Sequence, residues 1–174
     1  MKKLLLATTV LAGAFSLQAQ TQAAHIAEAK TIWNGAKGNL QKLAEAMPED
    51  GYGFKPTPDI RSFGELMGHI ADAQGLFCSM AAGKPKPDSV AKKTAKADLV
   101  AAMKDSIALC DAAFESLTEA NASESVGQGR MQRSRIASLE YNSVHSSEEY
   151  GYGAVYLRLK SVVPPSSAGR GPGR

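Results

Sequence analysis

Apolar residues recur every three or four positions in four stretches of this chain, separated by polar links containing glycine or proline. The stretches cover about residues 23–46, 62–82, 97–117 and 133–160. This spacing places the apolar side chains on one face of an amphipathic helix. No stretch shows a convincing strand pattern. Four such helices bury their apolar faces against one another, so the pattern predicts an all-α fold, a four-helix bundle over residues 23–163.

Capping and breaking residues mark the ends of the second helix most clearly. Ser62 is followed three residues later by Glu65, which is the pattern of a capping box, and Gly83 and Pro85 follow the last turn. Along the fourth helix the pattern predicts these buried apolar side chains: Ile136, Leu139, Val144, Val155 and Leu157.

The link between the second and third helices, residues 83–96, is rich in lysine and proline. It is long for a tight antiparallel connection, and it can carry the chain back along the bundle as a crossover loop. Helices 2 and 3 would then be parallel. Cys78 and Cys110 lie at similar depths in these helices, so they meet at one height only in the parallel arrangement. A disulfide between them is predicted, and the alternative is two small buried apolar side chains.

Both ends of the chain differ in composition from the bundle. Residues 1–19 combine a basic start, an apolar run and a small residue for cleavage, which is the pattern of a secretory signal peptide. Cleavage is expected after Ala19, or alternatively after Ala23 or Ala24. The protein is therefore expected to be exported to a bacterial periplasm or to the extracellular space. Residues 164–174 are predicted to be a disordered tail.

Charge narrows the classes of partner. The formal net charge is +3, and removal of Lys2 and Lys3 with the signal peptide lowers it to +1 (3 − 2). There is no basic stripe, which argues against nucleic acid as a partner. No later apolar run is long enough to span a membrane. The sequence is compatible with a small-molecule substrate and with a homodimer.

The chain has three histidines. His25 lies near the expected mature N-terminus, at the start of the first predicted helix, whereas His69 and His145 lie well inside the second and fourth predicted helices. Glu149 follows His145 by four residues, so both project from one helix face. With His69 on the second helix they can form a three-ligand site for a divalent metal that leaves positions open. The competing interpretation is that these are ordinary surface side chains. Residues expected to support the ligands from nearby helical positions are Glu65, Asp72, Asn142, Tyr152 and Tyr156.

The segment Phe54–Gln74, which contains Lys55-Pro56-Thr57-Pro58 and Gly68-His69, resembles the DinB-like family in its exported branch. The resemblance continues through Leu76–Cys78, Lys96–Val100 and Cys110–Ala113, and it ends at Tyr156–Lys160 with Val163–Ser167. It implies a four-helix bundle of the DinB/YfiT type with helices 2 and 3 parallel.

The resemblance also implies a divalent metal held by one histidine early in helix 2 and by a His-x-x-x-His pair in helix 4. His69 and His145 match two of these ligands, and Glu149 stands where the family usually has histidine. The cofactor expected from this set is zinc, nickel, iron or manganese.

Characterised relatives include metal-dependent thiol transferases and isomerases. The sequence therefore favours an exported metal-dependent transferase, similar to thiol S-transferases, or a hydrolase that acts on a small molecule. The alternative is a non-catalytic helical binding or scaffold module with a degenerate metal site.

Overall fold

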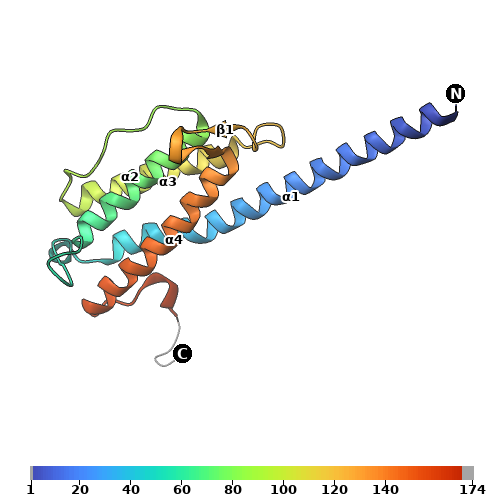
Figure 1. Ribbon diagram of the computed structural model, residues 1–174. Helices are drawn as coiled ribbons and strands as arrows, with labels where there is room; N and C mark the ends of the chain where they lie inside the picture. Colours follow the sequence, from blue (N-terminus) through green and yellow to red (C-terminus); the bar gives the residue numbers. More distant parts are fainter. Residues whose placement is uncertain (1, 170–174) are drawn as a thin grey trace.

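Four α-helices form a bundle in the computed structural model, which describes the backbone of residues 2–169 and the side chains of residues 21–169 (Figure 1). The helices are α1 (Lys2–Ala46), α2 (Phe63–Ala82), α3 (Lys96–Glu115) and α4 (Arg135–Leu159). The all-α prediction is confirmed. α2 begins at the predicted capping box, because Ser62 and Glu65 bond reciprocally, and it ends at Gly83 in the left-handed conformation.

Contacts between α2 and α3 advance together along both helices, so the predicted parallel arrangement is confirmed. Gly68 lies against Leu99, the Ser106 hydroxyl bonds to Gln74, and Cys78 is joined to Cys110. The disulfide links Cα atoms 5.0 Å apart. The crossover loop returns alongside α2, where the Asp72 carboxylate accepts hydrogen bonds from the Ser89 hydroxyl and the Val90 amide.

α4 runs antiparallel to α2. Near the start of α4 the Ser138 hydroxyl donates to the carbonyl of Phe77, and near its end the Tyr156 hydroxyl donates to the carbonyl of Arg61. This arrangement brings the first half of α2 beside the second half of α4. It is the feature of the fold that assembles the candidate site.

α1 begins at Lys2, far earlier than the predicted start near residue 23. The leucine- and alanine-rich N-terminal segment has high helix propensity and contains no proline, so it continues the helix. Figure 1 shows that the N-terminal half of α1 projects away from the bundle. The side chains of the predicted signal peptide lie outside the described residues, and that assignment stays a prediction. Among the described residues, no helix has the length and apolar character to cross a membrane.

A small hairpin precedes α4 and corrects the expectation of a strand-free chain. β1 (Ser125–Val126) pairs antiparallel with β2 (Arg133–Ser134). α4 therefore starts at Arg135, with Ser134 as its N-cap, two residues later than predicted. Strands of two residues are too short to produce an alternating sequence pattern. The connecting segments also contain the 3-10 helices Glu49–Gly51 and Gly129–Met131.

The predicted disordered tail is wrong for its first part. Pro165–Ser167 forms a 3-10 helix, in which the Ser166 amide donates to the Tyr150 hydroxyl and the Ser167 hydroxyl accepts from Arg158. Pro164 and Pro165 restrict the backbone and direct the chain back onto α4. Residues 170–174 lie outside the described residues.

The core contains two layers of different chemistry. The apolar layer is built from fully or almost fully buried side chains, Trp33, Leu40, Leu43, Met47 and Phe114. The polar layer is equally buried and comes from α2, α3 and α4: Gln74, Ser106, Asn142 and Ser146.

The outer side of α4 also carries apolar residues. The prediction that Val144 and Val155 are buried is wrong, because they are 65% and 52% exposed. Ile136, Leu139 and Leu157 are buried as predicted.

Candidate metal centre

α2 and α4 bring His69, His145 and Glu149 together. The Glu149 Oε1 atom lies 3.4 Å from Nε2 of His69 and 3.5 Å from Nε2 of His145. The two imidazole rings are edge-to-face, with centroids 5.1 Å apart. One ligand atom from each residue can be chosen so that all three lie within 4.8 Å of one another. Two imidazole nitrogens and one carboxylate oxygen on this scale can form a divalent metal site.

Burial of the three side chains suits ligands better than solvated surface groups. The Glu149 side chain is 9% exposed, that of His145 17% and that of His69 31%. Burial lowers the pKa of His69, and the positive charge of Arg61 lowers it further, whereas Glu149 opposes both effects. His69 is therefore neutral at neutral pH, which is the form of imidazole that binds metals.

The two nitrogens of His145 have different surroundings. Nε2 faces Glu149, while Nδ1 is buried and has no hydrogen-bond partner. One turn earlier on α4, the Asn142 Oδ1 atom is also buried and unpartnered. A metal-bound histidine normally donates its second N–H to an outer oxygen, and among the described residues His145 makes no such bond. Nε2 is therefore the nitrogen of His145 that faces the other candidate ligands.

The residues expected to support the ligands have other partners in the structure. Glu65 caps α2 and pairs with Lys55, Asp72 holds the crossover loop, and the exposed Tyr152 bonds to Glu148. The Asn142 amide contacts the Cys110 sulfur at 3.6 Å, and the Tyr156 hydroxyl bonds to Arg61. Sequence spacing placed them near the site but could not give their partners.

The polar layer extends from the centre into the core. The Ser106 hydroxyl donates to Gln74 Oε1 at 2.6 Å, and the Gln74 amide lies 3.4 Å from the hydroxyl of Ser146. Ser146 directly follows His145 in α4. These bonds link three helices behind the site, and they restrict how far the ligand-bearing segments of α2 and α4 can separate.

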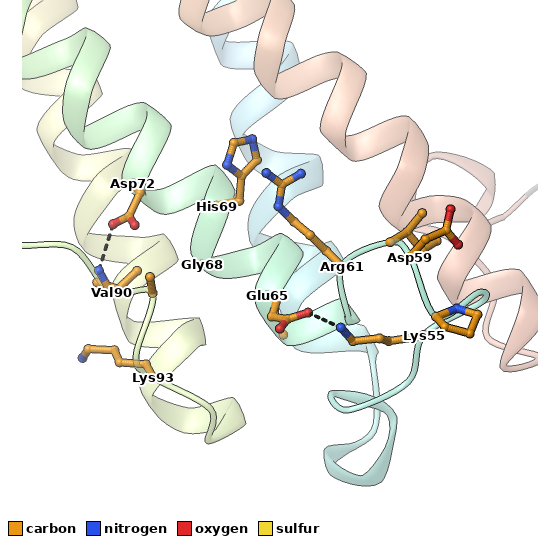
Figure 2. A pocket seen from close by; sticks show the side chains of 13 residues that line it. Lys55, Asp59, Arg61, Glu65, Gly68, His69, Asp72, Val90 and Lys93 are labelled. Atoms are coloured by element: carbon orange, nitrogen blue, oxygen red, sulfur yellow. Dashed lines mark hydrogen bonds and ion pairs between the residues drawn. The ribbon is translucent and has the colours of Figure 1, made fainter.

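Two cavities flank the centre. The first has a volume of about 510 Å³ and reaches His69, whereas the second has a volume of about 640 Å³ and reaches Glu149. Figure 2 shows the first cavity, with the Lys55–Glu65 ion pair on one wall and the Asp72–Val90 hydrogen bond on another. Both volumes suit a small molecule.

Arg61 belongs to the walls of both cavities, and sequence reasoning assigned it no role. In Figure 2 its guanidinium lies toward His69. One indication of this placement is present in the sequence: Arg61 directly precedes the Ser62 N-cap and lies eight residues before His69.

The third histidine is separate from this group. The imidazole of His25 lies on α1, where Nε2 is 2.5 Å from Glu140 Oε1, and its side chain is 48% exposed. Histidine and carboxylate groups therefore meet at two places among the described residues, and at one of them, between α2 and α4, two histidines share one carboxylate.

The sequence model of the DinB superfamily matches residues 33–146 of this chain. The chain belongs to the DinB superfamily. The matched range contains His69 and His145 and stops before Glu149. No curated protein matches the chain.

Solved DinB-like structures share the fold. A DinB-like protein from Bacillus cereus superposes with a TM-score of 0.70 at 14% identity, covering 79% of this chain and 93% of that one. A DinB-like protein from Bacillus subtilis gives a TM-score of 0.64 at 23% identity, covering 77% and 92%.

A mycothiol-dependent maleylpyruvate isomerase is also similar, with a TM-score of 0.60 at 18% identity. The match covers 76% of this chain and 60% of the isomerase. At identities this low, the superpositions establish a shared fold only, and the activity has to be argued from the site.

Proposed function

We propose that this DinB-superfamily protein binds one divalent metal ion through His69, His145 and Glu149 and acts on a small molecule. The observation that carries the proposal is the single carboxylate oxygen of Glu149 between two imidazole nitrogens, 3.4 and 3.5 Å away. A bound ion would supply Lewis acidity, which polarises a carbonyl group or lowers the pKa of bound water or thiol. Zinc, nickel, iron and manganese all accept this donor set.

The surroundings support a reaction on a small molecule. The centre lies between two cavities, so that a substrate in either one reaches a ligand residue. The similar fold of a mycothiol-dependent isomerase supports a metal-dependent transferase or isomerase-like reaction, and hydrolysis uses the same polarised water. Transferase or hydrolase chemistry on a small molecule is the function we infer.

Metal analysis tests the first step. Protein without a His-tag is incubated separately with Zn²⁺, Ni²⁺, Mn²⁺ and Fe²⁺, the last without oxygen, dialysed and analysed by mass spectrometry for bound metal. We expect one ion per chain. His69→Ala and His145→Ala should each weaken binding by at least about 100-fold, because loss of a ligand exceeds the about 10–100-fold cost of losing an outer partner.

His25→Asn is the matched control, since it removes a histidine that also lies beside a glutamate, outside the site. It should leave metal binding unchanged. Protein that stays metal-free with all four ions, or equal losses in His25→Asn and His145→Ala, would contradict the proposal.

Glu149→His separates the proposal from the alternative of a non-catalytic binding or scaffold module. Glu149 is buried against the two imidazoles, which supports a ligand role. A ligand glutamate predicts measurable affinity in the parent protein and retained affinity in the variant. Affinity that appears only in Glu149→His would support a degenerate site.

We also infer that the protein is exported. The buried Cys78–Cys110 disulfide supports this, because disulfides persist mainly in oxidising compartments. Mass spectrometry of protein from cell fractions tests it. The expected species starts after Ala19, or after Ala23 or Ala24, and full-length reduced protein confined to the cytoplasm would contradict export.

A further inference from the structure

The segment Asp59–Arg61 is the wall shared by the two cavities. All three of its residues line both spaces, while His69 lines only the first and Glu149 only the second. A group presented from this segment is therefore available to a ligand on either side of the candidate metal centre. Arg61 carries the one cationic side chain of the three.

The backbone that presents Arg61 is held from two sides. The Tyr156 hydroxyl of α4 donates to the Arg61 carbonyl at 2.7 Å. The next residue, Ser62, exchanges hydrogen bonds of 2.6 and 3.1 Å with Glu65 in the capping box. A long side chain on a fixed backbone can orient a ligand with less loss of entropy than one on a mobile loop.

Three charged groups of the first cavity already have partners, whereas the guanidinium of Arg61 has no hydrogen-bond or ion-pair partner among the described side chains. Lys55 pairs with Glu65 at 3.0 Å, and Asp72 accepts bonds from Ser89 and Val90. In Figure 2 the guanidinium is directed toward His69 and away from the Lys55–Glu65 pair. Its five donors form a planar fork that matches a carboxylate.

The second cavity supplies a surface for an apolar body. Its wall includes Arg61 and Glu149 together with four largely apolar or aromatic side chains, Leu66, Tyr152, Val155 and Tyr156. Tyr152 and Val155 are 53% and 52% exposed, so they present unburied apolar area to a ligand. Aromatic and aliphatic walls with one cation are typical of sites for small organic acids.

We propose that Arg61 binds the carboxylate of a small organic acid whose apolar or aromatic body lies against Tyr152, Val155 and Tyr156. The acid is then held beside the candidate metal centre, and this part of the inference rests on the proposed function. One free guanidinium balances one negative charge, and the neighbouring Asp59 and Glu149 disfavour a second. A monocarboxylate therefore fits better than a phosphate dianion.

Calorimetric titration of the full chain with phenylpropionate tests the proposal, with the neutral phenylpropionamide and with phenyl phosphate as comparison ligands. Arg61→Gln should weaken phenylpropionate binding by about 10–100-fold, because it removes a charge-assisted bidentate contact. The affinity of Arg61→Lys for phenylpropionate should lie between those of the parent and Arg61→Gln, since lysine keeps the charge but cannot form the planar fork. Val155→Asp should also weaken binding, through the apolar wall. The amide should bind at least about tenfold more weakly than the acid.

Lys93→Gln is the matched control, because Lys93 lines the first of the two flanking cavities but not the second. It should bind phenylpropionate like the parent protein. Equal affinity for acid and amide, equal affinity for the acid and phenyl phosphate, or unchanged binding in Arg61→Gln would each overturn the proposal.

Titrations of metal-free and zinc-loaded protein distinguish this proposal from the metal proposal. Arg61-dependent binding to a chain that takes up no metal supports the carboxylate site and contradicts the metal centre. Normal zinc uptake in Arg61→Gln together with weakened acid binding supports both. Zinc uptake without any binding of the acid contradicts the carboxylate site alone.

Discussion

The apolar and polar layers of the core are equally buried but differ in what they contribute. In the apolar layer Trp33 stacks on Phe114, with ring centroids 5.8 Å apart. In the polar layer hydroxyl and amide groups bond one another across α2, α3 and α4, next to the candidate metal centre. Buried polar groups add little net stability but define geometry, whereas apolar burial supplies most of the stability. The bundle thus separates the residues that hold it together from those that position the candidate ligands.

Trp33→Ala should produce the largest loss, because Trp33 is 1% exposed and its indole N–H donates to Asp111 at 2.7 Å. A large-to-small change in a packed core costs about 3–5 kcal/mol. Urea denaturation measures this loss. Metal affinity of the folded fraction should be unchanged, and a selective loss of metal affinity would show that the layers are not independent.

Reduction of the Cys78–Cys110 disulfide tests the boundary between the layers, where Asn142 contacts the Cys110 sulfur. The bridge spans a sequence separation of 32, for which loop entropy gives about 3–4 kcal/mol. The paired variant Cys78→Ala/Cys110→Ala should lose a similar free energy of unfolding. Reductant should shift the denaturation midpoint of the parent and leave that of the variant unchanged.

Tyr52 brings a polar group beside the apolar layer, where its hydroxyl donates to the Ala44 carbonyl at 2.6 Å. Burial raises the pKa of Tyr52, and the charges of Glu49 and Glu45 add to this. The pKa of Tyr52 in the folded protein exceeds the unfolded value of about 10. The contribution of Tyr52 to the free energy of unfolding is therefore complete below about pH 10 and decreases as the pH rises further. The loss is about 1.4 kcal/mol per pH unit.

Urea denaturation of the parent and of Tyr52→Phe at increasing pH measures this effect. The parent should lose stability faster above pH 10 than the variant, and equal slopes would contradict the assignment. Tyr141→Phe is the control, because Tyr141 is 48% exposed. In this variant the free energy of unfolding should change with pH as it does in the parent.

Glu149→Gln should give the smallest change in stability. The metal-free protein should become more stable, whereas its affinity for metal should fall. A carboxylate on a buried side chain beside two imidazoles is costly without a cation, so the metal-free variant should gain up to about 1 kcal/mol. Thermal unfolding with and without zinc measures both changes, and a variant that loses stability without zinc would contradict this interpretation.

The sequence could predict the bundle and the three candidate ligands because both follow from helical periodicity. Ser62 and Glu65 marked the start of α2 locally, and the depths of the two cysteines predicted its direction relative to α3. Periodicity could not predict the role of residues whose position depends on tertiary contacts. Arg61 lies beside the centre because Tyr156, ninety-five residues away, holds its carbonyl.

Periodicity also failed along α4, for a different reason. This helix has apolar residues on both of its sides, and spacing alone does not say which side the bundle covers. The side containing Leu139 and Leu157 is buried, while Tyr141, Val144, Tyr152 and Val155 face outward. The polar residues Asn142, Ser146 and Glu149 lie inside instead. Ser146 and Glu149 meet polar groups of α2, and Asn142 contacts the Cys110 sulfur of α3.

The Cys78–Cys110 bridge closes a covalent ring that contains the whole crossover loop. Within that loop Lys84 and Lys86 each precede a proline, which protects them from trypsin-like proteases, whereas the exposed Lys92 and Lys93 are unprotected. A cut there opens the ring without releasing a fragment, because the two pieces stay joined through sulfur. Nicked protein would migrate as one intact chain until a reductant separates it, and a protease-rich environment could cut this loop without dissociating the two helices that it connects.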